Sequence, residues 1–409
     1  MKSVCCIFLG LSFHLALFTQ IPECNNGMYQ TEQFSGFTLQ SNIQYGQAVN
    51  SEGVNLPLLL DIYLPDGDNR TLRPVLLLAH GGSFIGGSKT ADNSIVELCS
   101  RFAKLGYVTA SMNYRLENPL TIFLSPDVEK TFIEAVYRAL QDQKAAIRYL
   151  RKSVAEMGNP YGIDPNRIVV GGNSAGAILS LHNVYLDKAS EVPPGINPNL
   201  GDLEGASGNP GYPSGAQAVI NICGALADSV WIEPGNQPFV SLHGDQDGTV
   251  PHNTDIANPG IPLMEVDGSL SLYQRAQNVG VRNDLELWYG AGHSPQNSSA
   301  AYMDSTFWYV RDFLWDMICN EQLGITTQQE SNSLVYPNPF SKSANKRLYF
   351  STGWTGSVRL VDSDGKVVLS RELNSETQIN EMPLLPAGCY SLVWTKANGS
   401  SEIHKIVVN

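Results

Sequence analysis

The segment Gly172–Gly176, with the sequence GNSAG, is the feature that most constrains the fold of this chain. It follows the apolar run Arg167–Gly171 and precedes the segment Ala177–His182. A buried strand, a five-residue turn and a helix start are the context of a nucleophile elbow, in which a strained turn exposes a serine hydroxyl. A Cβ at either glycine would crowd the strand against the helix. The same pattern can occur by chance in a chain with 37 glycines, so the interpretation of Ser174 depends on the rest of the sequence.

Composition and net charge limit the kinds of molecule that this chain is expected to bind. The chain has 409 residues and 43% hydrophobic content, enough for one large core and a smaller second domain. A net charge of −13 argues against nucleic acid or an anionic membrane surface as partner, because both attract basic patches. The seven cysteines show no C-x-x-C spacing and no Cys/His cluster. We therefore expect no metal and no organic cofactor.

Residues 1–20 are predicted to be a secretory signal peptide. Lys2 supplies the positive charge, and Val4–Phe18 forms the apolar stretch that follows it. An N-terminal membrane anchor is the alternative. Removal of the signal would take Cys5 and Cys6 and leave five cysteines. Because five is odd, at least one thiol would stay unpaired, and the sequence assigns no disulfide.

Residues 34–320 are predicted to form one α/β domain. It begins with a hairpin of Ile43–Val49 and Leu56–Leu64. Apolar runs then alternate with helical patterns, which indicates a doubly wound, mostly parallel sheet. The further expected strands are Pro74–Ala79, Tyr107–Met112, Arg167–Gly171, Ala218–Cys223, Pro238–His243 and Leu285–Tyr289, and the expected helices are Ile95–Leu105, Val128–Met157, Leu270–Val279 and Ala300–Cys319.

Two segments depart from this alternation. Pro193–Gly215 is rich in Pro, Gly and Asn and too long for an ordinary connection, so it is either an excursion over the site or a disordered surface loop. Residues 321–334 are polar and are predicted to be a linker. Beyond the linker, residues 335–409 contain two hairpin patterns and no helical pattern, which predicts a small all-β domain of the Ig-like sandwich kind.

An acyl-transfer serine needs a base, an acid that orients the base, and donors for the oxyanion. Three loops that directly follow apolar strands carry such groups: Gly81–Ser83, Asp245 with Asp247, and His293. The carboxyl ends of parallel strands meet at one edge of a sheet, so these loops should gather around Ser174. The order serine, acid, histidine is that of the α/β-hydrolases.

Competing residues remain for two of these roles. His252 is the alternative base, although it follows no strand of its own. Asp247 is preferred as the acid, and Asp245 is then expected to be a structural turn residue. His243 precedes the acid loop too closely to act as the base.

The stretch Leu56–Cys319 resembles the esterase/lipase branch of the α/β-hydrolases, of the hormone-sensitive-lipase or acetyl-esterase kind. The elbow Gly172–Gly176 is similar to the G-x-S-A-G motif of that branch. His80–Ser83 resembles its H-G-G-G turn, Asn113–Leu116 its D-Y-R-L segment, and His243–Asp247 its H-G-x-x-D motif, whose last residue is the triad acid.

This resemblance implies an oxyanion hole formed by the backbone N–H groups of Gly82, Ser83 and Ala175. Two residues depart from the family pattern. Ser83 replaces a glycine, which requires either a negative φ or tolerated strain. Asn173 stands where the branch often has an acid.

The region from Val335 resembles a type IX secretion sorting domain. The matching segments are Tyr336–Phe340, Asp364–Lys366, Leu385–Tyr390 and the terminal KIVVN. The resemblance implies export across an outer membrane to the cell surface or medium, with the type IX secretion machinery as a partner. A sugar-binding β-sandwich is the alternative.

Together these features predict a secreted serine carboxylesterase. Ser174 would be the nucleophile, His293 the general base and then acid, and Asp247 the residue that holds the imidazole. The substrate would be a small-molecule ester or a polysaccharide-linked ester, and the sequence identifies neither acyl group nor alcohol. The alternatives are a serine peptidase of the prolyl-oligopeptidase kind and a non-catalytic binding protein on a hydrolase scaffold.

Overall fold

The computed structural model describes residues 24, 26–319, 335–336, 347–362, 366–380, 382–396 and 401–408. The predicted signal peptide and linker lie outside these residues. The chain divides into two compact units, Met1–Leu323 and Gly324–Asn409. None of the described helices is long and apolar enough to cross a membrane.

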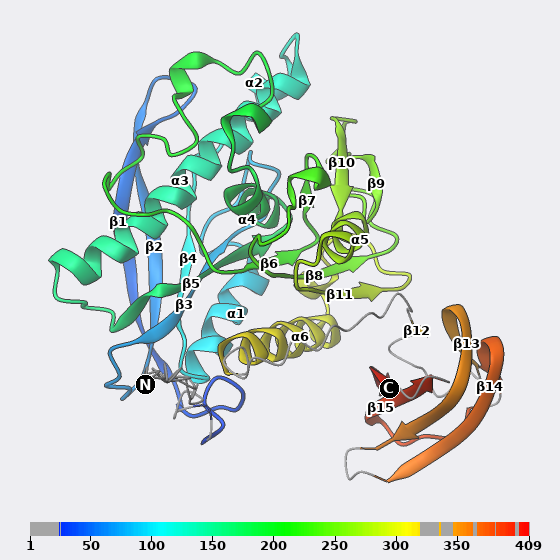
Figure 1. The fold of residues 1–409 in the computed structure, drawn as a ribbon. Coiled ribbons are helices and arrows are strands. Elements are labelled where there is room, and N and C mark those ends of the chain that lie inside the picture. The colour runs from blue at the N-terminus through cyan, green and yellow to red at the C-terminus, as the bar shows by residue number, and fades with distance from the viewer. Residues whose placement is uncertain are drawn as a thin grey trace, which may run out of the picture. The chain divides into compact units, whose positions relative to one another are not determined.

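An eight-stranded sheet forms the centre of the first unit (Figure 1). Its order is β1 (Phe37–Val49), β2 (Asn55–Pro65), β4 (Val108–Met112), β3 (Arg73–Ala79), β5 (Ile163–Asn173), β6 (Val219–Ile222), β8 (Phe239–Gly244) and β11 (Asn283–Trp288). The pairs β1–β2 and β2–β4 are antiparallel, and the strands from β4 to β11 pair in parallel. The predicted hairpin and the mostly parallel doubly wound sheet are confirmed.

Helices cover both faces of this sheet. The helices are α1 (Asn93–Lys104), α2 (Pro119–Phe123), α3 (Val128–Glu156), α4 (Ala175–Tyr185), α5 (Ser269–Val279) and α6 (Ala300–Cys319). Along β3, Val75 and Leu77 join the core formed with α3 and α4, whereas Leu76 and Leu78 join the core formed with α1 and α6. This division explains why the strand is a continuous apolar run, since successive side chains point to opposite, covered faces.

A small second sheet stands beside the carboxyl ends of the central strands. It consists of β7 (Ala225–Leu226), β10 (Glu265–Gly268) and β9 (Thr254–Ile256), paired antiparallel. The sequence did not predict it, because strands of two to four residues are too short to show a period.

The excursion Pro193–Gly215 is held against α3. Tyr137, Gln141 and Arg148 of α3 donate hydrogen bonds to backbone carbonyls of residues 200–208. Its Ser207 hydroxyl donates to the fully buried Asp142 at 2.6 Å. These contacts argue against a free surface loop.

A disulfide joins Cys24 to Cys319, 295 residues apart in sequence, and so ties the N-terminal segment to the end of α6. Cys99 and Cys223 are buried free thiols. This pairing was not predictable, because nothing in the sequence shows that the two ends of the first unit meet.

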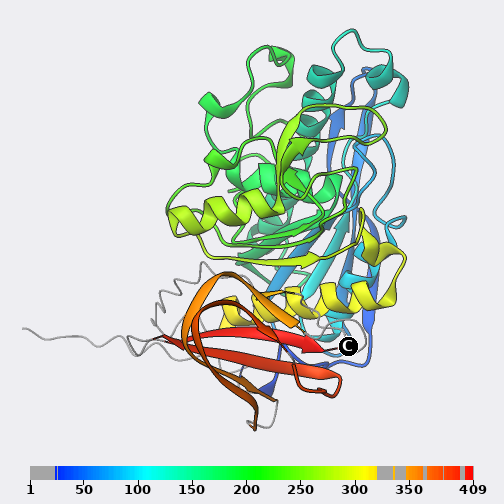
Figure 2. The same ribbon diagram turned by 90° about the vertical axis from the view of Figure 1, so that its right-hand side faces the viewer.

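The second unit is all β, as predicted, but its described strands form one sheet and not the two sheets of an Ig-like sandwich. Its strands β12 (Val335–Tyr336), β13 (Arg347–Val361), β14 (Val367–Asn380), β15 (Gly388–Lys396) and β16 (Ser401–Val408) pair antiparallel in one sheet, with β13 bonded to β12, β14 and β15 (Figure 2). Trp354 and Trp394 stack with ring centroids 4.4 Å apart inside its own apolar core.

Candidate active site

The turn between β5 and α4 holds Ser174 in a strained backbone conformation, with φ 52° and ψ −117°. The flanking glycines make this turn possible. A Cβ at Gly176 would lie 2.1 Å from the carbonyl oxygen of Ala79, and one at Gly172 would lie 2.4 Å from the same atom. The N–H of Ser174 donates to Ile222 on the neighbouring strand at 2.8 Å, which fixes the turn to the sheet. A positive φ in a non-glycine residue costs about 1–3 kcal/mol and persists only where the surroundings impose it.

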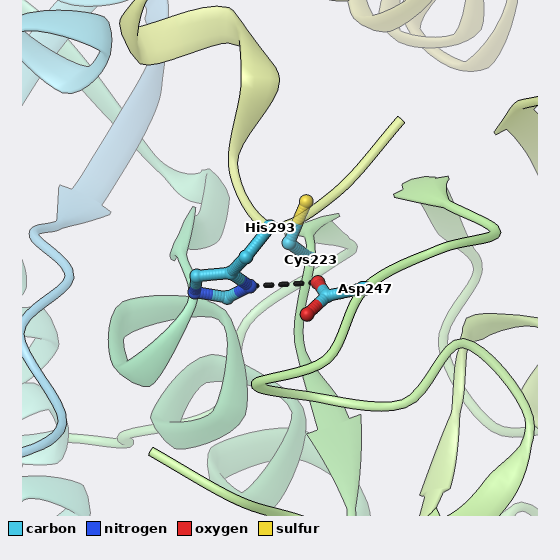
Figure 3. A group of neighbouring side chains, drawn as sticks. All are labelled: Cys223, Asp247 and His293. Carbon is cyan, nitrogen blue, oxygen red and sulfur yellow. Dashed lines mark hydrogen bonds and ion pairs between the residues drawn. The ribbon is translucent and has the colours of Figure 1, made fainter. Parts of the chain in front are cut away.

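The structure brings Ser174, His293 and Asp247 into one hydrogen-bonded chain. Nε2 of His293 lies 2.9 Å from the Ser174 hydroxyl, and Nδ1 lies 2.7 Å from Oδ2 of Asp247. Figure 3 shows the imidazole facing this carboxylate. Ser174 is 6% exposed, and Asp247 lies on the loop after β8, while His293 follows β11. The three loops therefore meet at the carboxyl edge of the sheet.

The Asp247 carboxylate is held on both of its oxygens. Oδ1 accepts hydrogen bonds from the backbone N–H groups of Thr249 and Val250, at 2.8 and 3.0 Å. Oδ2 faces His293 and also His243, whose Nε2 lies 3.2 Å away. Burial alone would raise the pKa of this carboxyl, but the hydrogen bonds from His243 and His293 outweigh burial and lower the pKa well below its usual range. Asp247 is therefore ionised at neutral pH.

The two competing residues occupy other positions. Oδ1 of Asp245 accepts a hydrogen bond from the N–H of Gly290 at 2.6 Å, so Asp245 ties the loop after β8 to the loop that carries His293. The ring of His252 stacks edge-on against His243 with centroids 6.5 Å apart. Among the described residues, no hydrogen bond joins either of them to Ser174.

The turn after β3, called the oxyanion turn below, holds Gly82 and Ser83, whose N–H groups are two of the three donors expected from the sequence. Gly82 has φ 119° and Ser83 has φ 53°. The Gly82 carbonyl accepts from Ile85 and Gly86, both at 3.0 Å, which closes the turn. Within the described part of the chain, the N–H groups of Gly82, Ser83 and Ala175 make no hydrogen bond. Because φ of Ser83 is positive, the serine that replaces the glycine of the family pattern holds a strained backbone conformation.

His80 supports this turn from behind. Its ring stacks on Tyr114 with centroids 4.4 Å apart, and the Tyr114 hydroxyl donates to the His80 carbonyl at 2.8 Å. Burial lowers the pKa of His80, so its imidazole is neutral.

An apolar pocket opens beside Ser174. Its walls come from the oxyanion turn, α3, α4 and the small second sheet; they include Phe84, Phe132, Leu140, Ile178, Trp231 and Met264. His182 of α4 also lines it, with Nδ1 bonded to the carbonyl of Ile178 at 2.8 Å. Burial lowers the pKa of His182 to about 4, so the pocket carries no cationic imidazole at neutral pH.

One group of described residues offers three atoms that could coordinate a metal ion. Cys223, Asp247 and His293 place their ligand atoms within 4.8 Å of one another (Figure 3). Two of the three are the hydrogen-bonded acid and imidazole, and burial raises the pKa of the Cys223 thiol to about 12. A metal bound here would separate Asp247 from His293, so such binding and the hydrogen-bonded chain exclude each other.

Comparison with known protein families finds a match in each of the two units. The BD-FAE family model matches residues 60–226, which contain the oxyanion turn and the elbow. The part of the first unit that carries these two motifs therefore matches a family of α/β-hydrolase esterases. A model described as a secretion system C-terminal sorting domain matches residues 334–409. The second unit is this sorting domain, and it indicates secretion across the outer membrane.

Individual relatives match only parts of the chain. Phenmedipham hydrolase of Pseudarthrobacter oxydans is 35% identical over 120 residues, which are 29% of this chain and 21% of that protein. Arylacetamide deacetylase of Bos taurus is 32% identical over 180 residues, 42% of this chain and 39% of that protein. The chain thus spans less than half the length of these relatives. A thermophilic esterase from Thermogutta terrifontis, solved with propionate, covers 70% of this chain and 96% of its own at 21% identity and a TM-score of 0.50, so it shares the fold.

Proposed function

We propose that this protein is a secreted serine carboxylesterase in which Ser174, His293 and Asp247 are the catalytic triad. The observation that carries the proposal is the unbroken chain from the Ser174 hydroxyl through both nitrogens of His293 to Asp247. The N–H groups of Gly82, Ser83 and Ala175 are the proposed oxyanion hole. The family match in the first unit supports the same reaction class.

The geometry suits a two-step acyl transfer. Nε2 of His293 takes the proton of the Ser174 hydroxyl while Oγ attacks the ester carbonyl, and the N–H donors stabilise the oxyanion that forms. His293 then gives this proton to the departing alcohol, which leaves an acyl group on Ser174. A water molecule attacks the acyl-enzyme in the same way, with His293 as base and then acid. The ionised Asp247 stabilises the imidazolium in both steps.

The pocket beside Ser174 suggests the substrate class. Its walls are almost entirely apolar, and its ionisable histidine is neutral, so it favours an aliphatic or aromatic group over a sugar or a charged group. The ester should therefore carry an alkyl or aryl substituent that enters this pocket. The relatives named for phenmedipham and for arylacetamides are consistent with a compact apolar group.

Polysaccharide-linked esters are a second candidate. The sorting domain supports a substrate outside the cell, as an esterified polysaccharide would be. In that case the apolar acyl group would occupy the pocket, and the sugar would remain outside it.

A substrate panel with a nucleophile variant tests the proposal. p-Nitrophenyl acetate, butyrate and laurate are compared with acetylated xylan, methyl ferulate and a prolyl peptide anilide. Ser174→Ala should lower kcat by about 10⁶-fold. Ser180→Ala is the control, because Ser180 is a buried serine of α4 that bonds the Gly176 carbonyl and touches no proposed catalytic group.

Three outcomes would contradict this function. Cleavage of the peptide anilide in preference to every ester would favour a peptidase. A folded wild-type protein that cleaves none of the substrates would favour a binding role. Retention of more than a few per cent of activity by folded Ser174→Ala would place the nucleophile elsewhere.

A further inference from the structure

The side chain of Asn173, next to the proposed nucleophile, reaches in two directions. Its Nδ2 donates to Oδ2 of Asp92 at 2.9 Å. Its Oδ1 accepts from the Ser294 hydroxyl at 2.8 Å and from Nε2 of Gln296 at 3.0 Å. Asn173 is 3% exposed. These bonds connect the elbow with the segment that directly follows His293.

Asp92 continues the connection to the oxyanion turn. Its Oδ2 accepts from the N–H of Gly81 at 3.0 Å as well as from Asn173. Its Oδ1 accepts from the hydroxyl of Ser94 at 2.8 Å and from the N–H of Ile95, so Asp92 also caps α1. One side chain at position 173 therefore lies between the two loops that carry the proposed oxyanion donors and the proposed base.

We propose that Asn173 is a positioning residue that fixes the oxyanion turn and the His293 loop relative to Ser174. The inference rests on the proposed function. The position needs a group that donates on one side and accepts on the other, because Asp92 offers only acceptors while Ser294 and Gln296 donate. A carboxamide meets both needs with a single side chain.

The same geometry explains why this elbow carries an amide and not an acid. A carboxylate at position 173 would place its oxygen about 2.9 Å from the Asp92 carboxylate, and two such groups cannot both ionise without a large penalty. The pair would keep one proton at low pH and use it as the missing donor. As the pH rises this proton is lost, and the two carboxylates repel each other.

The other titratable groups near Asp92 are uncharged, so they do not produce the pH-dependent repulsion expected for the two carboxylates. His80 and Tyr114 lie within electrostatic reach of Asp92. Burial keeps both neutral, because it lowers the pKa of His80 and raises the pKa of Tyr114. Apart from Asp92, the side chains that bond Asn173 are those of Ser294 and Gln296, which carry no charge.

The test is the pH dependence of Asn173→Asp. The kcat of the variant is divided by the wild-type kcat at each pH from 6 to 10, which removes any pH dependence that the two enzymes share. We expect a ratio within about threefold of one at pH 6, and a fall of about tenfold to a hundredfold at high pH, the size of effect that a misplaced catalytic geometry produces. The double variant Asp92→Asn/Asn173→Asp removes the repulsion, so its ratio should no longer depend on pH.

Asn183→Asp is the matched control. Asn183 is also buried in the first unit, but its amide donates to Oε1 of Gln143 and to no carboxylate. Its kcat ratio should be independent of pH, even if burial of the new carboxyl lowers the melting temperature. The melting temperatures of all variants are measured at each pH.

Several results would overturn the proposal. One is a kcat ratio of Asn173→Asp to wild type that does not change with pH, whatever the value of the ratio. A second is a fall that the Asp92→Asn change does not remove. A third is an equal fall in the Asn183→Asp control. Failure of the esterase proposal is distinguishable, because it would appear as absent ester hydrolysis in the wild type.

Discussion

Nε2 of His243 lies 3.2 Å from Oδ2 of Asp247, the same oxygen that receives the Nδ1 of His293 at 2.7 Å. Both His243 and the Asp247 side chain are fully buried. The other nitrogen of His243 bonds the hydroxyl of Ser269 at 2.7 Å, so its ring is held from both ends. The proposed triad acid is thus positioned by a second histidine that is unable to reach the nucleophile.

His243→Ala should lower kcat by about tenfold to a hundredfold without abolishing activity. It removes the contact of Nε2 with the charged carboxylate, beside the bond of the same atom to the Val250 carbonyl at 3.0 Å; a bond to a charged group is worth about 1.5–3 kcal/mol. His252→Ala is the control, since His252 is adjacent to His243 and makes no hydrogen bond to Asp247 among the described residues. Its kcat should stay within about twofold of wild type. An equal loss of kcat in both variants, at unchanged melting temperature, would contradict the role given to His243.

The two aspartates after β8 should respond differently to removal of their charge. Asp247→Asn should lower kcat by about 10⁴-fold, because the amide favours the wrong tautomer of His293. Asp245→Asn should act mainly on stability, since Asp245 bonds the Gly290 backbone and not the imidazole. Steady-state kinetics and thermal unfolding of both variants check this assignment. A silent Asp247→Asn beside an inactive Asp245→Asn would reverse it.

The fold was predictable because the strand patterns, the elbow glycines and the positions of the loops all indicate the same architecture. The strands buried on both faces, such as β3, are continuous apolar runs bounded by turns. The elbow glycines are required by contacts with Ala79 that no Cβ could share. The loops with Asp247 and His293 follow the parallel neighbours β8 and β11, so the sheet alone brings them to one edge.

Contacts between loops were not predictable in this way. The signal for Asn173 lay in the polar residues Ser294 and Gln296 directly after His293, but their pairing depends on loop conformation. His243 was set aside as the base from its place in the sequence, whereas its contact with Asp247 depends on the conformation of the turn between them. The small second sheet is too short to show a period.

The disulfide should contribute strongly to stability. Cys24 and Cys319 close a loop with a sequence separation of 295 residues, for which the chain-entropy model gives an upper figure of roughly 5–6 kcal/mol. The double variant Cys24→Ser/Cys319→Ser should therefore melt at a clearly lower temperature and keep its kcat. A reductant should lower the melting temperature of the wild type and leave that of the double variant unchanged. A wild type that is indifferent to reduction would contradict this contribution.

Stability should fall as the pH drops from about 6.5 toward 4. Burial lowers the pKa of His182 from 6.5 to about 4, so in this window the unfolded chain binds a proton that the folded chain does not. The expected loss at pH 4.5 is about 2–3 kcal/mol from His182. The lowered pKa of Asp247 acts separately, because its contribution is present above its unfolded pKa and is lost only below about pH 4. Urea unfolding of wild type and His182→Gln at pH 7.5 and 4.5 measures the difference, and equal losses in both proteins would contradict it.

The sorting domain should be required for export and dispensable for catalysis. All proposed catalytic residues lie in the first unit, and the second unit has an apolar core of its own. A chain that ends at Gln328 keeps the Cys24–Cys319 disulfide. It should therefore show the full-length kcat/KM and melting temperature when purified. In the native host it should accumulate in the periplasm, whereas full-length Ser174→Ala, which is inactive but keeps the sorting domain, should reach the cell surface or medium. Reduced activity of the purified shorter chain would show that residues after 328 contribute to the active site.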